Sequence, residues 1–201
     1  MKFVVAGDTD AMTELSEGRE QIEWLQVPDA SAFSEHKDAD AFFNLYDDAW
    51  QGDYHLLNKP VFLNSVARTL SGVENVVRFN GWKGFIAHET WELSGPMNSS
   101  FEKVLEALHK KYLITADEPG FISARIIALI INEAWFALGD DISTEAEIDV
   151  AMKLGTNYPY GPFEWGHKIG MKNIYDLLQQ MCLQHQKYMP APLLQQHIQS
   201  L

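Results

Sequence analysis

The sequence predicts a small α/β part followed by an all-α part, because its hydrophobic periodicity changes once, near Gly95–Asn98. Before this point, short β-branched and aromatic runs alternate with turn residues, as is typical of strands. After it, apolar residues recur at helical spacing. Gly95-Pro96 interrupts the chain between the two patterns. We therefore expect an α/β domain over residues 1–96 and a helical domain over residues 97–201.

The first part contains six candidate strands, separated by turn residues. Their spacing leaves little room for full crossover helices between some of them, so we expect a reduced, parallel-type sheet. An acidic loop over residues 47–53 follows the third strand. The candidate strands are Lys2–Gly7, Gln21–Val27, Ala39–Tyr46, Pro60–Ser65, Asn75–Phe79 and Glu89–Leu93.

The second part is dominated by one long apolar helix, predicted over Phe121–Leu138 and ended by Gly139. It is apolar on nearly all sides, which is typical of a buried central helix. Thr144 and Glu147 form a capping-box pattern for a shorter helix. Tyr158–Phe163, rich in proline and glycine, predicts a rigid turn. The other predicted helices are Phe101–Tyr112, Thr144–Leu154, Asn173–Lys187 and Ala191–Ser200.

Charge and composition exclude several classes of partner. The formal net charge is −13, and a field of that sign repels nucleic-acid phosphates and anionic membranes. The longest apolar run, Ile126–Ile131, is too short to span a bilayer, and Phe3–Ala6 is too short for a signal-peptide core. The single cysteine, Cys182, cannot form an intramolecular disulfide, and the histidines show no metal-ligand spacing. We expect a cytoplasmic protein without nucleic-acid, membrane or metal partners.

Four motifs in the second part occur in a fixed order, and Ile169-Gly170 follows them. They are D-E-P-G-F-I-S-A-R at Asp117–Arg125, N-E-A at Asn132–Ala134, E-I-D-V-A-M-K-L-G at Glu147–Gly155, and Y-P-Y-G-P-F-E at Tyr158–Glu164. Together they resemble the C-terminal helical domain of the 3-hydroxyacyl-CoA dehydrogenase family. The resemblance implies a 6-phosphogluconate-dehydrogenase-C-like helical domain after a Rossmann-like one. It also implies NAD as cofactor, an acyl-CoA or related small molecule as ligand, and a homodimer formed through the helical domain.

The family's catalytic residues are matched only in part. Oxidation of a 3-hydroxyl by NAD needs a base, usually a histidine, and a carboxylate that orients it. The family's H-F-F-N-P motif is matched by Val77–Gly81, so that Val77 occupies the base position. Asn80 is retained as a candidate substrate-binding residue, and Glu89, twelve residues after Val77, is the candidate catalytic carboxylate. Ala124 replaces an asparagine of the family.

The glycine-rich turn that binds a dinucleotide is also degenerate. Ala6–Met12 follows the first strand where G-x-G-x-x-G is expected, and only Gly7 remains as a candidate cofactor-binding residue. Asp8 and Asp10 place negative charge where a pyrophosphate would lie. The first part is therefore a reduced, degenerate Rossmann-like domain, and we expect that NAD is not bound.

These observations leave three functions open for a protein of fatty-acid and acyl-CoA metabolism. The favoured one is a non-catalytic family member, a pseudoenzyme that keeps the fold and an acyl or CoA groove. The second is an active but divergent NAD-dependent 3-hydroxyacyl-CoA dehydrogenase. His88 is its candidate replacement base, although neighbouring residues of a strand, such as His88 and Glu89, point to opposite faces. The third is a purely structural dimerisation module.

Overall fold

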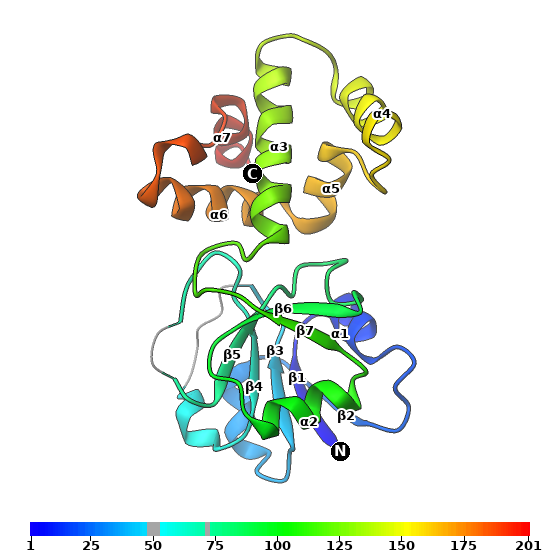
Figure 1. Ribbon diagram of the computed structural model, residues 1–201, viewed down its shortest axis with the longest axis vertical. Coiled ribbons are helices and arrows are strands. Elements are labelled where there is room, and N and C mark those ends of the chain that lie inside the picture. Colours follow the sequence, from blue (N-terminus) through cyan, green and yellow to red (C-terminus); the bar gives the residue numbers. More distant parts are fainter. Residues whose placement is uncertain (48–52, 71–72) are drawn as a thin grey trace. The chain divides into compact units, whose positions relative to one another are not determined.

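The computed structural model describes residues 1–47, 53–70 and 73–201, so most of the expected acidic loop lies outside the described residues. The chain forms two compact units, Met1–Phe121 and Ile122–Leu201 (Figure 1). This division falls later in the chain than the boundary expected after residue 96. Helix α2 (Ser99–Ala107) packs on the sheet and strand β7 (Lys111–Ile114) extends it, which makes both part of the first unit.

The first unit is built on a seven-stranded sheet with the strand order β2-β1-β3-β4-β5-β6-β7. All neighbouring strands are parallel except β5 and β6, which are antiparallel. This mostly parallel sheet confirms the Rossmann-like prediction, and each of the six predicted strands is present. Their bounds are β1 Lys2–Ala6, β2 Glu23–Val27, β3 Ala41–Asn44, β4 Val61–Asn64, β5 Val76–Phe79 and β6 Thr90–Ser94.

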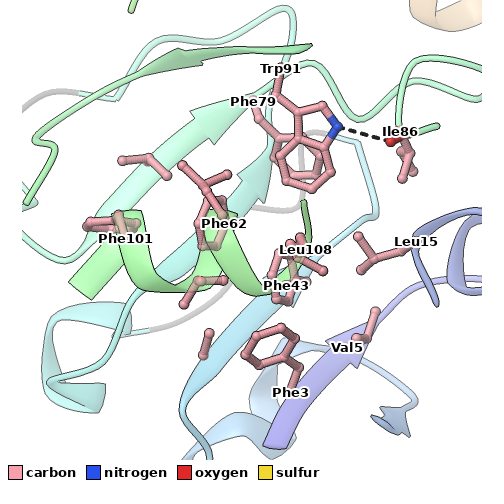
Figure 2. Close-up of a cluster of buried hydrophobic side chains, with 14 of the residues drawn as sticks. Phe3, Val5, Leu15, Phe43, Phe62, Phe79, Ile86, Trp91, Phe101 and Leu108 are labelled. Carbon is pink, nitrogen blue, oxygen red and sulfur yellow. Dashed lines mark hydrogen bonds between the residues drawn. The ribbon is translucent and has the colours of Figure 1, made fainter. Parts of the chain in front are cut away.

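The two faces of the sheet are covered differently, because successive side chains of a strand point to opposite faces. Helix α2 and helix α1 (Thr9–Ser16) contribute to the hydrophobic cluster on one face, which Figure 2 shows. Two short 3-10 helices, η1 (Ala30–Glu35) and η2 (Tyr54–Leu57), contribute to the cluster on the other. This second face therefore carries short turns of helix rather than long crossover helices.

The prediction of a helix over Phe101–Tyr112 is wrong at its C-terminal end. Helix α2 already ends at Ala107, and His109 adopts the left-handed conformation with a φ of 53°. Lys111–Ile114 then pairs with β6 as strand β7. Helix α1, which directly follows the first strand, has no counterpart among the predicted elements.

The second unit is all-helical, as predicted. Helix α3 (Ser123–Gly139) is central and contacts three of the others, namely α5, α6 and α7 (Figure 1). Among the described residues, no helix combines the length and apolarity required to cross a membrane. The remaining elements are α4 Glu145–Thr156, α5 Pro162–Ile169, α6 Met171–Gln184, η3 Gln186–Tyr188 and α7 Pro192–Gln199.

Four local expectations for the second unit can be compared with the structure. Helix α3 begins two residues late because Phe121 has a φ of 50°, which a right-handed helix does not allow. Gly139 is its last residue, and the left-handed residue that follows is Asp141, with a φ of 52°. The Thr144–Glu147 capping box is present. Only the first half of the predicted turn is irregular, since Pro162 starts helix α5.

Candidate functional site

The connection between β1 and α1 is the place where a Rossmann-like fold binds a dinucleotide. Gly7 lies here, and a Cβ on Gly7 would come within 2.9 Å of the Leu45 Cβ. Packing alone therefore accounts for the glycine. Asp8 is the N-cap of α1, and its carboxylate accepts a hydrogen bond of 2.8 Å from the Ala11 amide. A carboxylate of the chain itself thus occupies the helix N-terminus that would otherwise receive a phosphate.

Two further carboxylates of α1 are bound by the loop between β5 and β6. Asp10 forms an ion pair with Lys83, whose hydrogen bond lowers the pKa of Asp10. Glu14 accepts hydrogen bonds from the backbone amides of Gly84 at 3.1 Å and Ala87 at 2.9 Å. The N-terminal turns of α1 are consequently acidic and already partnered within the chain.

A dinucleotide does not fit this arrangement. Its pyrophosphate needs free backbone amides and a neutral or positive environment, whereas Asp8 occupies one amide and adds negative charge. An acidic residue after the second strand binds the ribose in many such folds, and Asp29 has that position. Here the Asp29 carboxylate caps η1 by accepting a hydrogen bond from the Ser31 amide at 2.8 Å.

The segment matched to H-F-F-N-P is buried and structural. Val77 on β5 is fully buried and belongs to the hydrophobic cluster beneath α1 and α2. The Asn80 side chain, 5% exposed, accepts a hydrogen bond of 3.3 Å from the Trp82 amide and so fixes the turn after β5. Gly81 packs so closely that a Cβ there would lie 2.8 Å from the Asn64 side chain. No titratable side chain stands at the base position.

Glu89 and His88 lie on the surface just before β6, not within a strand. The Glu89 carboxylate is 69% exposed and pairs with the Lys111 ammonium at 2.7 Å. This hydrogen bond from Lys111, together with its charge, lowers the pKa of Glu89. His88 is exposed, and its ring lies 5.1 Å from that of Phe85. The structure does not bring Glu89 together with Val77, which is sealed in the core.

The residue that follows Val77 forms a buried polar centre that the sequence motifs did not indicate. Arg78 is fully buried, and its Nε donates to the Asp117 carboxylate at 2.8 Å. One Nη donates to the carbonyls of Ser65 and Arg68 at 2.7 and 2.6 Å, and the other to that of Glu118 at 3.0 Å. The guanidinium is therefore engaged on every nitrogen. We call these five residues the Arg78 centre.

Asp117, the first residue of the D-E-P-G-F motif, holds further groups in the same place. Its carboxylate accepts hydrogen bonds from the Leu70 amide at 3.0 Å and from the Ser94 hydroxyl at 3.3 Å. The ring of Phe121, in the same motif, lies 4.7 Å from the Arg78 guanidinium carbon. This motif thus completes the packing of the first unit around a buried charge.

The motifs of the second unit are likewise explained by internal hydrogen bonds. Asp149 is 7% exposed, and it accepts from the amides of Phe163 at 2.8 Å and Glu164 at 3.1 Å, which caps α5. A Cβ on Gly161 would lie 2.3 Å from an Asp149 oxygen, so that only glycine fits there. Ala124 is fully buried on α3.

Asn132 of the N-E-A motif is buried on α3 and binds the segment before α7. Its side-chain oxygen accepts from the Ala191 amide at 2.8 Å, and its nitrogen donates to the Met189 carbonyl at 3.0 Å. The motif residues of this unit therefore serve its packing.

Among the described residues, no group of three or more His, Cys, Asp or Glu could hold a metal ion.

Comparisons with known proteins agree with the motifs of the second unit. Residues 120–200 match the family described as 3-hydroxyacyl-CoA dehydrogenase, C-terminal domain. The 3-hydroxyadipyl-CoA dehydrogenase of Escherichia coli K12 is 45% identical over 96 residues, which are 46% of this chain and 20% of that protein. The 3-hydroxybutyryl-CoA dehydrogenase of Bradyrhizobium diazoefficiens is 36% identical over 95 residues, 46% of this chain and 32% of that protein. The chain thus spans a fifth to a third of these relatives.

Solved structures show the same fold over nearly the whole chain. The (S)-3-hydroxybutyryl-CoA dehydrogenase of Ralstonia eutropha superposes with a TM-score of 0.69 at 18% identity, covering 99% of this chain and 93% of that one. FadB2 of M. tuberculosis gives a TM-score of 0.74 at 12% identity with the same coverages. The motifs and the matched family model identify residues 120–200 as a C-terminal domain of the 3-hydroxyacyl-CoA dehydrogenase family.

Proposed function

We propose that this chain is a member of its family that has lost NAD-dependent oxidation of 3-hydroxyacyl-CoA. The observation that carries the proposal is the Asp8 carboxylate at the N-terminus of α1, hydrogen-bonded to the Ala11 amide. A pyrophosphate at this helix end would meet an anion already in place, and the first turn carries a second carboxylate, Asp10, which is paired with Lys83.

The environment of the base position supports the same proposal. Val77 has no proton to exchange and is fully buried, while Arg78 beside it is committed to the Arg78 centre. Loss of a general base lowers a rate by roughly 10²- to 10⁴-fold. Loss of the cofactor site in addition removes the hydride acceptor, which no residue of the chain can replace.

The chain retains the helical unit of the family. The names of its relatives indicate the chemical class of the ligand that we propose. They are dehydrogenases of 3-hydroxyadipyl-CoA and 3-hydroxybutyryl-CoA. We therefore propose an acyl-CoA or related small molecule as ligand, and a homodimer formed by the helical unit. Exposed apolar side chains favour the dimer, since α4 carries Val150 and Leu154 at 52% and 83% exposure, one helical turn apart.

The activity assay follows NADH absorbance with acetoacetyl-CoA, using the wild-type chain and a Glu89→Gln variant. We expect no turnover above the uncatalysed rate for either protein, because Val77 cannot act as a base and the Asp8 carboxylate lies where the cofactor's pyrophosphate would bind. Turnover by the wild type that Glu89→Gln abolishes would show that Glu89 works with an unrecognised base, and it would refute the proposal.

Light scattering tests the proposed dimer. The measured mass should be twice the 22.8 kDa mass of one chain, and it should fall toward the mass of one chain in a Leu154→Lys variant. A monomeric wild type at micromolar concentration would refute the dimer.

A further inference from the structure

A cavity of about 730 Å³ lies on the face of the sheet that carries the two 3-10 helices. Its walls come from η1, from η2 with Asn58 and Lys59 after it, and from Phe42 on β3. The helices η1 and η2 are only six and four residues long, and residues of both line the cavity. The volume lies within the range of roughly 300–1,000 Å³ that is typical of small-molecule sites.

The inner wall of the cavity is aromatic and rigidly packed. The Phe33 ring lies 4.9 Å from that of Phe42 and 6.2 Å from that of Tyr54, and all three residues are buried. The Tyr54 hydroxyl accepts a hydrogen bond from Asn44 at 2.9 Å, which fixes the ring. Leu56, also on the wall, is 66% exposed. The three aromatic residues therefore form a closed floor, and the apolar surface open to a ligand comes from Leu56 and the half-buried Leu57.

The charge of the cavity differs from that of the chain. Two lysines, Lys37 and Lys59, line it together with a single acidic residue, Asp53. Neither lysine forms an ion pair among the described residues. In a chain whose formal net charge is −13, this is a local excess of positive charge beside apolar surface. Unpaired ammonium groups at such a place attract an anion.

We propose that this cavity binds a small amphipathic carboxylate with an apolar tail, its carboxylate beside Lys37 and Lys59. The tail lies against Leu56 and Leu57 above the aromatic floor, which excludes water from it. Helix α1 contributes to the core of the opposite sheet face, so this site does not depend on the degenerate dinucleotide site. The proposal is also independent of the proposed loss of dehydrogenase activity.

Calorimetric titration of the whole chain with sodium octanoate tests the proposal, with octan-1-ol as the neutral analogue and hexanoate as the shorter acid. We expect octanoate to bind at one site and hexanoate, which is two methylenes shorter, to bind about 15-fold more weakly, since each buried methylene contributes about fourfold. Octan-1-ol should bind about tenfold more weakly than octanoate because it lacks the charge. Absence of octanoate binding, or equal binding of octan-1-ol, would overturn the proposal.

Variants locate the site. Lys37→Ala combined with Lys59→Ala should weaken octanoate binding about tenfold, whereas Lys103→Ala combined with Lys172→Ala removes the same charge from exposed positions outside the cavity and should not. Ser34→Trp adds bulk at the exposed rim and should abolish binding, with circular dichroism checking that the variant is folded. Unchanged binding in the Lys37/Lys59 variant, or an equal loss in the control, would refute the assignment of the site.

Discussion

Replacement of Arg78 by methionine tests the buried polar centre most sharply. Met retains much of the length of the side chain but removes the four hydrogen bonds that the guanidinium donates to Asp117 and to three backbone carbonyls. Three backbone carbonyls then lose their hydrogen-bond donor, and each loss lowers the free energy of unfolding by about 1 kcal/mol. The ion pair with Asp117, whose side chain is 34% exposed, adds about 1 kcal/mol after solvent screening. The total of about 4 kcal/mol agrees with the roughly 3–5 kcal/mol lost when a buried ion pair is broken.

Urea unfolding followed by tryptophan fluorescence measures this loss, because Trp82 and Trp91 are buried in the same unit. We expect the free energy of unfolding of Arg78→Met to fall by about 4 kcal/mol. The free energy of unfolding of Lys103→Met, an exposed control, should stay within about 0.5 kcal/mol of the wild-type value. A loss below about 1 kcal/mol for Arg78→Met would refute the reasoning, since it would mean that the carbonyls find other donors.

Two further changes test other parts of the structure. Gly161→Ala should lower the free energy of unfolding by about 2 kcal/mol, because its Cβ would collide with Asp149, and a melting temperature equal to that of the wild type would contradict the close packing. Burial lowers the pKa of Lys110 to about 8 from its usual value of 10.5, so the unfolded chain binds more protons between these values. The free energy of unfolding should therefore rise from pH 8 to pH 10.5, by about 1 kcal/mol after a discount for solvent screening, because the group is only half buried. Lys110→Met should lack this rise, and equal pH profiles of the two proteins would disprove it.

The strands of the first unit could be predicted because each is a short β-branched or aromatic run with turn residues on both sides. Strand β7 could not, since its apolar residue Tyr112 continues the spacing of Leu105 and Leu108 in the preceding helix. Pairing with β6, a contact formed only in the folded chain, decides its conformation. Helix α5 was hidden for a related reason, because its first residue, Pro162, is also a turn residue.

Some features of the candidate site can be read from the sequence, and others depend on contacts that form only in the folded chain. The missing glycines and the acidic residues Asp8 and Asp10 are visible in the sequence, and the structure adds that Asp8 caps α1. The Arg78 centre was not predicted, because Arg78 and Asp117 are 39 residues apart in the chain. The one signal was a charged residue inside the apolar strand β5, where a buried partner is required.

Direct titration of NADH into the purified chain tests the central claim that the dinucleotide site is lost. We predict no saturable binding at NADH concentrations up to the millimolar range, because the Asp8 carboxylate already occupies the N-terminus of α1. Saturable binding of NADH that competes with NAD and weakens when Gly7 is changed to valine in a variant that remains folded would contradict the account.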